Sequence, residues 1–306
     1  MARVPSMKMI LDMDTGIDDA VAIALALGSP EVDVLAITSV AGNAPVELCT
    51  RNCLLLNELL GGDAVVAAGS DRPLVKRLLT AQEVHGADGL GGRAGSLPEP
   101  VTSAVDEPAP ELLARLPEEH PGEITLVTTG PLTNIALALR ANPDAVASYA
   151  RIITMGGAFD VPGNTGPVAE FNFYVDPEAA ALVLGSGLDI TLVPLDATTG
   201  AVLTRSSLEA HERARGLPAD RPSRDVAGIL HRALDHYMEF QFDESGLDGG
   251  YMHDPLAVAA ALEPRVLETL DLSVGVVTDG PDRGRTVRRP AQAHAAAPGR
   301  GVHVAF

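Results

Sequence analysis

The sequence predicts a single α/β domain with a mostly parallel central sheet flanked by helices, of the Rossmann-like kind. Short apolar runs such as "ITLV" and "RIITM" alternate with helical patterns along the 306-residue chain. Strands that are apolar throughout suit a parallel sheet buried on both faces, and their alternation with helices implies right-handed crossovers. The 46% hydrophobic content supplies a sizeable core. Because no segment has the composition of an interdomain linker, we expect one domain over residues 1–306.

The order of elements follows from the hydrophobic pattern. Short β-rich runs predict strands at Lys8–Leu11, Val32–Ser39, Ile124–Thr128, Arg151–Met155, Ile190–Pro194, Leu272–Thr278 and Val302–Phe306. Helical periodicity predicts helices at Asp18–Leu27, Val46–Leu60, Leu132–Arg140, Pro177–Leu184, Arg224–Phe242 and Pro255–Leu262. Segments that break the pattern predict surface loops at Arg93–Pro110, Gly216–Arg224 and Asp279–Gly301.

Charge and composition narrow the choice of partner. Lysine and arginine number 22 against 41 acidic residues, which gives a formal charge of −19. So acidic a surface repels phosphate backbones and anionic lipid, so we expect neither a nucleic-acid nor a membrane partner. The start of the chain lacks the apolar region of a signal peptide, and no run is long enough to span a membrane. We therefore expect a cytoplasmic protein. Cys49 and Cys53, four apart on a predicted helix, are expected to be buried thiols.

The stretch "DMDTGIDD" holds Asp12, Asp14, Asp18 and Asp19 within eight residues, after an apolar run and before a helical one. Gly16 allows a tight turn between the two elements. Carboxylates this close repel one another unless a cation neutralises them, and capping of the helix accounts for only one or two of them. Since Ca²⁺ and Mg²⁺ prefer oxygen ligands, the cluster predicts a site for one of these ions.

Other polar residues follow later strands. In open α/β sheets, ligands bind beyond the carboxyl ends of the strands, so these residues should converge with the aspartates. They are Asn43 in "AGN", Thr129 in "TTGPLTN", and the stretch from Met155 to Asn172.

Within that last stretch, Asn164, Glu170 and Asn172 carry the groups that bind vicinal hydroxyls of a sugar. Glu170 and Asn172 are two residues apart, so on an extended chain they would share a side. A polar surface loop is the alternative.

Histidines stand at two further places. Asp254, before Pro255, is either a helix N-cap or a fifth carboxylate for the cation, and His253 beside it could then donate a proton. His85 lies in the glycine-rich "VHGADGLGG", which is either a mobile lid or an ordinary loop.

Taken together, these motifs resemble the inosine–uridine-preferring nucleoside hydrolase family. The family's "DxDPGxDD" signature matches Asp12–Asp19, with Thr15 where proline is usual. "AGN", "TGPLTN", "MGG", "GN", "AEFN", "DP" and "HDP" follow in the family's order over nearly the whole chain. The resemblance implies that fold, Ca²⁺-dependent hydrolysis of the N-glycosidic bond of ribonucleosides, a role in nucleoside salvage, and a homotetramer or homodimer.

The resemblance also implies a role for each matched residue. The calcium ligands would be Asp14, Asp18, Asp254 and the Thr129 carbonyl, with Asp19 at or beside the ion. Asp14 would be the general base on a calcium-bound water, and Asp12 would support it. The ribose would be held by Asn43, Asn164, Glu170 and Asn172, with Met155 lining the sugar pocket. His85 and His253 would face the base, and His253 would assist its departure.

Base preference and two rival functions stay open on the sequence. The purine-preferring branch stacks the base between tryptophans, and this chain has none, so pyrimidine or broad specificity is expected. His236, Tyr237 and Phe240 are either partial core or base contacts. A haloacid-dehalogenase-type Mg²⁺ phosphatase would also begin with Asp12 and Asp14, but its motif expects threonine or valine at Gly16. A non-catalytic nucleoside-binding protein on the same fold is the other alternative.

Overall fold

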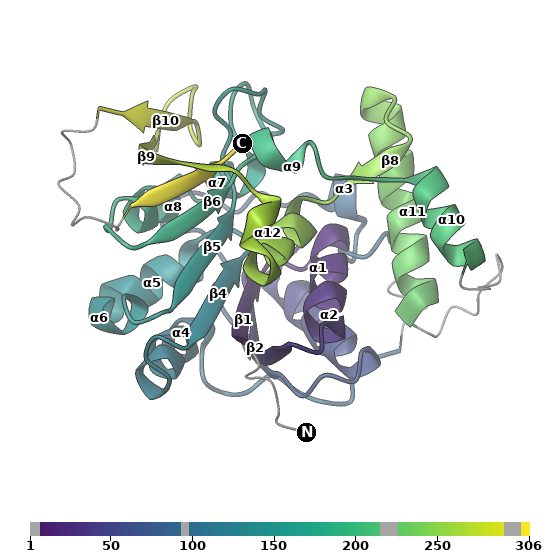
Figure 1. The fold of residues 1–306 in the computed structure, drawn as a ribbon, viewed down its shortest axis with the longest axis horizontal. Helices are drawn as coiled ribbons and strands as arrows, with labels where there is room; N and C mark the ends of the chain where they lie inside the picture. The colour runs from purple at the N-terminus through teal and green to yellow at the C-terminus, as the bar shows by residue number, and fades with distance from the viewer. Residues whose placement is uncertain (1–6, 93–97, 215–225, 291–300) are drawn as a thin grey trace.

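The computed structural model describes residues 7–92, 98–214, 226–290 and 301–306, and their centre is a nine-stranded sheet with helices on both faces (Figure 1). The strand order is β10-β9-β11-β6-β5-β4-β1-β2-β3. Pairing is parallel from β11 to β3, while β9 pairs antiparallel with both β10 and β11. The predicted single-domain α/β fold with a mostly parallel sheet is confirmed.

The sheet and a separate two-stranded ribbon account for the strands. The sheet strands are β1 Met7–Met13, β2 Val32–Ser39, β3 Val65–Ala68, β4 Ile124–Thr128, β5 Arg151–Met155, β6 Ile190–Val193, β9 Thr269–Val276, β10 Thr286–Arg289 and β11 Val302–Ala305. The ribbon pairs β7 Val202–Thr204 with β8 Gly249–Tyr251. Each predicted strand is present, within three residues at either end.

The helices were predicted less completely. The elements that match predictions are α1 Ile17–Gly28, α2 Val46–Leu59, α5 Thr133–Ala141, α8 Pro177–Leu184, α11 Val226–Ser245 and α12 His253–Leu262. The elements that were not predicted are α3 Gln82–His85, α4 Ala109–Glu119, α6 Pro143–Val146, α7 Phe171–Val175, α9 Leu195–Thr198, α10 Arg205–Ala214 and the 3₁₀ turn Pro264–Val266. In the part of the chain described, no helix is long and apolar enough to cross a membrane.

Alternate residues of β1 face opposite layers of the core. Met9 and Leu11 pack with α1, α2 and α12 on one face of the sheet. Ile10 packs on the other face with residues of α4, α5 and α8. Figure 1 shows these two helix layers on either side of the central strands. A third cluster, which includes Ile17 and Tyr237, packs α11 against the start of α1.

The structure corrects two of the predicted loops. Pro108 and Pro110, taken as loop residues, lie at the N-cap and in the first turn of α4, where proline is tolerated. The stretch 279–301 contains the edge strand β10. Its exposed arginines interrupt the apolar pattern of a strand, so it was not predicted. Parts of these predictions lie outside the described residues. They are the predicted loop Gly216–Arg224, Arg224 as the start of the predicted helix, and residues 93–97 and 291–300.

Candidate active site

Four buried aspartates meet where two helices begin. Asp14 follows β1, Asp18 and Asp19 lie in the first turn of α1, and Asp254 lies in the first turn of α12, which packs against α1. Oxygen atoms of Asp18, Asp19 and Asp254 all lie within 4.8 Å of one another. Because α12 begins at His253 with Met252 as its N-cap, the alternative that Asp254 caps the helix is wrong.

Burial raises the pKa of every carboxyl group in this cluster, and the charges of neighbouring aspartates raise it further for Asp14, Asp18 and Asp254. Burial is the larger cause for Asp14, followed by the charges of Asp19 and Asp18. Burial and then Asp19 raise the pKa of Asp18 to about 7. The pKa of Asp254 is raised well above its usual range by burial and then by Asp18. A cation among these groups would reverse the shifts, because it favours the ionised form.

Asp14 is held by one side-chain oxygen and leaves the other without a hydrogen bond. Its Oδ2 accepts a 2.7 Å hydrogen bond from the backbone amide of Asn43. Its Oδ1 is buried and has no hydrogen-bond partner among the described residues. The Asn43 side chain donates to Asp19 at 3.1 Å. Asn43 therefore joins the cluster, as predicted from its place after β2.

Thr129 connects the cluster to the residues predicted to bind the sugar. Its hydroxyl donates a 2.6 Å hydrogen bond to Asp19, and its carbonyl accepts one of 2.6 Å from the Asn172 side chain. The same Asn172 nitrogen lies 3.6 Å from the Met155 sulfur. The structure thus places Thr129, Asn172 and Met155 together beside the aspartates.

Glu170 and Asn164 organise the turn that carries Asn172. The Glu170 carboxylate is the N-cap of α7 and accepts from the amides of Asn172 at 2.8 Å, Gly157 at 3.0 Å and Phe173 at 3.1 Å. The prediction of extended chain here is wrong, because this capping starts a helix at Phe171. Asn164 is exposed, and its side-chain oxygen accepts from the Phe171 amide at 2.9 Å. It supports the turn without touching the aspartates.

The two predicted base-side histidines flank the cluster. His85 Nδ1 accepts a 3.1 Å hydrogen bond from the Ile17 amide, and its ring stacks on Tyr237 at 6.0 Å between centroids. His253 Nδ1 lies 2.7 Å from the Thr198 hydroxyl. Loss of solvent lowers the pKa of His85 to about 3, with the nearby His253 adding to the effect, and lowers that of His253 to about 4. Both rings are neutral near pH 7.

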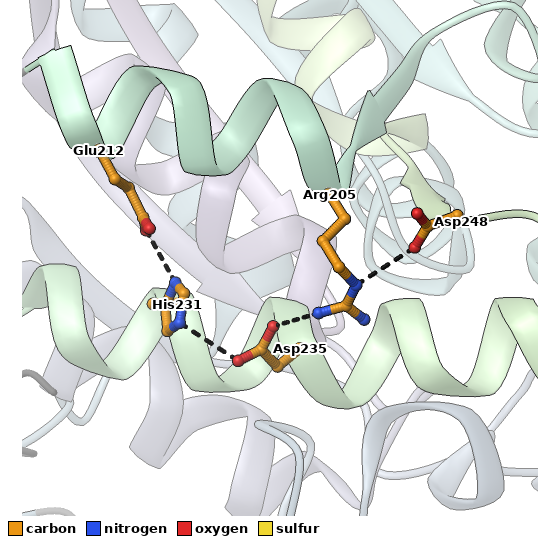
Figure 2. A network of polar contacts seen from close by, with 5 residues as sticks. All are labelled: Arg205, Glu212, His231, Asp235 and Asp248. Carbon is orange, nitrogen blue, oxygen red and sulfur yellow. Dashed lines mark hydrogen bonds and ion pairs between the residues drawn. The ribbon is translucent and has the colours of Figure 1, made fainter. Parts of the chain in front are cut away.

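Helix α11 carries Tyr237, whose ring stacks on His85, and a polar network joins the same helix to α10 and to Asp248 (Figure 2). Arg205 at the start of α10 pairs with Asp235 of α11 at 2.8 Å and with Asp248 at 3.2 Å. His231 bridges Glu212 and Asp235. Tyr237 is buried, whereas His236 and Phe240 are half-buried.

Sequence reasoning placed Asp12 after β1 and missed the residues that hold it. Asp12 lies inside β1, opposite Thr38 of β2 and Thr128 of β4. Its Oδ1 accepts from the Thr38 hydroxyl at 2.6 Å and from the Asn134 side chain at 2.8 Å. Burial raises the pKa of Asp12 to about 6. "TGPLTN" contained Asn134, but the pattern alone gave no sign that it reaches back to β1.

Gly16 is required by close approach rather than by a left-handed turn. Its φ is −95°, which any residue adopts. A Cβ atom at this position would lie 2.6 Å from His85 Nδ1 and 2.7 Å from the Asn43 side chain. The glycine therefore lets His85 and the carboxylate cluster come together. Cys49 and Cys53 are free, buried thiols, as expected.

Comparison with protein families and curated proteins gives one consistent result. The family model described as inosine-uridine preferring nucleoside hydrolase matches residues 9–305. The pyrimidine-specific ribonucleoside hydrolase RihA of Salmonella newport (strain SL254) is 44% identical over 277 residues, covering 90% of this chain and 86% of that protein. RihA of Escherichia coli O8 (strain IAI1) is 42% identical over 285 residues, covering 92% and 88%.

Solved structures agree with this result. A plant nucleoside hydrolase, PpNRh1, superimposes with a TM-score of 0.88 at 36% identity, covering 99% of this chain and 94% of that one. A purine-preferring ribonucleoside hydrolase from Gardnerella vaginalis gives a TM-score of 0.87 at 33% identity, covering 97% and 92%. These similarities favour neither a phosphatase nor a non-catalytic binding protein.

Proposed function

Because the chain belongs to the inosine-uridine preferring nucleoside hydrolase family, whose members here are ribonucleoside-hydrolysing enzymes, we propose that it is a Ca²⁺-dependent hydrolase of pyrimidine ribonucleosides. The observation that carries the proposal is the buried group of Asp14, Asp18, Asp19 and Asp254 beside Thr129. Uridine and cytidine are the proposed substrates, since the RihA relatives carry the name pyrimidine-specific.

The donor set fits a hard divalent cation. All candidate ligands are oxygens, three of the carboxylates already converge, and Asp14 Oδ1 is buried without a partner. The Thr129 carbonyl accepts from Asn172 but has a second lone pair. We propose that Asp14, Asp18, Asp254 and the Thr129 carbonyl hold the ion, with Asp19 at its edge. When bound, Ca²⁺ would supply a fixed positive charge that orients the sugar hydroxyls and makes a water more acidic.

On the sugar side, we propose that Asn43, Asn172 and Glu170 bind the ribose hydroxyls and that Met155 lines the pocket. Asn172 and Met155 already lie together, and Glu170 places Asn172 by capping α7. Asn164 is proposed to contribute by holding this turn, and its exposed side chain leaves it available to a bound sugar.

The proposed reaction breaks the bond between ribose C1′ and the base nitrogen. A water attacks C1′, Asp14 accepts the water's proton, and the bonding electron pair leaves with the base. The sugar develops positive charge as the bond breaks, and the surrounding carboxylates stabilise that charge. A neutral His253 near the departing base donates an N–H hydrogen bond to it, and His85 lines the base side.

A substrate panel tests this proposal. Reducing-sugar release should be fastest with uridine and cytidine, slower with inosine and slowest with adenosine. EGTA should remove the activity, and Ca²⁺ should restore it better than Mg²⁺. Turnover of p-nitrophenyl phosphate without release of ribose from any nucleoside would contradict the proposal. The expected homodimer or homotetramer is tested separately by light scattering.

A further inference from the structure

We propose that Asn52 of α2 is a positioning residue that fixes the carboxylate loop, residues 14–16, against the glycine-rich turn, residues 86–92, which follows His85. The inference rests on the proposed function only in placing His85 on the base side of the substrate. Among the described residues, Asn52 makes no hydrogen bond to the carboxylate side chains of the cluster, so it would act through the backbone of two loops.

The first support is the pair of hydrogen bonds made by one buried amide. Asn52 Nδ2 donates to the Thr15 carbonyl at 3.3 Å and to the Asp88 carbonyl at 2.9 Å. The side chain is fully buried, and its Oδ1 has no hydrogen-bond partner among the described residues. Both acceptors are carbonyl oxygens, so the NH₂ group must face them. The two donated hydrogen bonds therefore come at the cost of an unsatisfied buried oxygen on the same side chain.

The second support is that the same side of α2 grips the carboxylate loop at two further points. The Cys49 thiol donates to the Asp14 carbonyl at 3.1 Å. The Cys53 sulfur lies 2.8 Å from the Thr15 hydroxyl. These contacts hold the Asp14 carbonyl and the Thr15 side chain against α2. Helix α2 therefore fixes the position of the loop that bears Asp14.

The third support comes from the glycine-rich turn. Gly89 has a φ of +79°, and a Cβ atom there would lie 3.0 Å from Asn52 Nδ2 and 3.1 Å from the Thr15 carbonyl oxygen. The turn also folds back on His85, because the Gly91 amide donates to the His85 carbonyl at 2.8 Å. The carboxylate loop and the glycine-rich turn thus meet at one asparagine side chain.

This junction sets the separation of the two ends of the proposed substrate site. Asp14 belongs to the proposed sugar end and His85 to the proposed base end. On the other side of the carboxylate loop, the Ile17 amide donates to His85 Nδ1 at 3.1 Å. Without Asn52, the glycine-rich turn loses its hydrogen bond to α2, which lets it move relative to Asp14. The value of kcat/KM should fall most for substrates whose sugar and base must both be held in place for the reaction.

The test compares two variants with two matched controls. Asn52→Leu removes both donated hydrogen bonds, and Gly89→Ala pushes the same junction apart from the other side. Asn57→Leu is the control for the first, because Asn57 is a buried asparagine of the same helix that donates only to Ala64 at 3.0 Å and also has an unpartnered Oδ1. Gly122→Ala is the control for the second, since its φ is +72° with open space around it.

We expect both test variants to lose about 10- to 100-fold in kcat/KM for uridine, the scale of a small misplacement. Hydrolysis of p-nitrophenyl riboside, whose activated leaving group needs little from the base side, should change far less. Hydrogen exchange of peptides covering residues 14–17 and 84–92 should accelerate in the test variants and not in the controls.

Three results would overturn the inference: loss of uridine turnover equal to that of the controls, equal losses on both substrates, or unchanged exchange at the two loops. If Asn52→Leu does not fold, Gly89→Ala carries the same prediction. A wild-type protein that releases no ribose contradicts the proposed function instead, and the exchange measurement still tests the inference.

Discussion

The hydroxyl group of Thr129 donates a 2.6 Å hydrogen bond to Asp19, joining the end of β4 to the first turn of α1 inside the carboxylate cluster. Thr129→Val keeps the carbonyl and the shape but leaves a buried carboxylate oxygen without this donor. We expect the free energy of unfolding to fall by about 1.5–3 kcal/mol, as for hydrogen bonds to charged groups. Urea denaturation measures this loss.

The neighbouring threonine provides the control for that variant. Thr128 donates to the hydroxyl of Thr154 at 3.0 Å, a neutral pair. Thr128→Val should therefore cost only about 0.5–1.5 kcal/mol. An equal loss in the two variants would show that the charge on Asp19 plays no part in the Thr129 interaction.

Asp14→Asn should separate function from stability. It removes the proposed general base, so kcat for uridine should fall by about 10²- to 10⁴-fold. It also removes one of several buried carboxyl groups that repel one another, so the metal-free variant should have a higher Tm than the wild type. Calorimetry and ribose release measure the two effects. Asp33→Asn, at an exposed position on β2, should change neither, and a wild-type kcat in Asp14→Asn would refute its assignment.

The raised carboxyl pKa values predict how the metal-free protein responds to pH. Asp18 has a folded pKa of about 7 and Asp12 of about 6, against 3.8 for an ordinary aspartate, so the folded state binds protons more tightly than the unfolded chain. Their contribution to stability is complete below about pH 4 and is lost as the pH rises to about 7. In chelator, Asp18→Asn should gain stability relative to wild type across this window. A difference independent of pH would contradict the burial argument, and added Ca²⁺ should remove the difference.

His253→Ala tests assistance to the departing base. Because the ring is neutral near pH 7, it would act by hydrogen bonding to a poor leaving group. We expect uridine hydrolysis to slow by about 10²- to 10⁴-fold, and p-nitrophenyl riboside hydrolysis to slow much less. His120→Ala, which removes a half-buried histidine bonded to Lys8, serves as the control. Equal losses on both substrates would exclude a leaving-group role.

The parts of the fold that the sequence predicted are those that local pattern determines. Apolar strands such as β4 and β5, buried on both faces, stand out from their flanks, and their alternation with helices sets the parallel order. The elements that were missed are short or contain misleading residues. Helix α4 begins among prolines, and edge strand β10 carries exposed arginines. Their stability comes from tertiary contacts that no local pattern contains.

The candidate site divides in the same way. The convergence of Asp14 and Thr129 could be predicted, because strand ends of a parallel sheet share one edge. Asp254 follows β8 of the separate ribbon, and its place at the site was expected only from the family resemblance. The roles of supporting residues could not. Asn134 reaches Asp12 across 122 residues of sequence, and Asn52 reaches Asp88 across 36. Such contacts depend on how helices pack on the sheet, which composition and spacing do not specify.

The central claim is that this carboxylate cluster binds a ribose for hydrolysis, and its most direct test compares uridine with deoxyuridine on the calcium-loaded protein. A site built to bind a hydroxyl group rejects the substrate that lacks it, by as much as about 10⁴-fold. The account predicts rapid release of ribose from uridine and a kcat/KM for deoxyuridine lower by up to that factor. Comparable rates on the two nucleosides would contradict it.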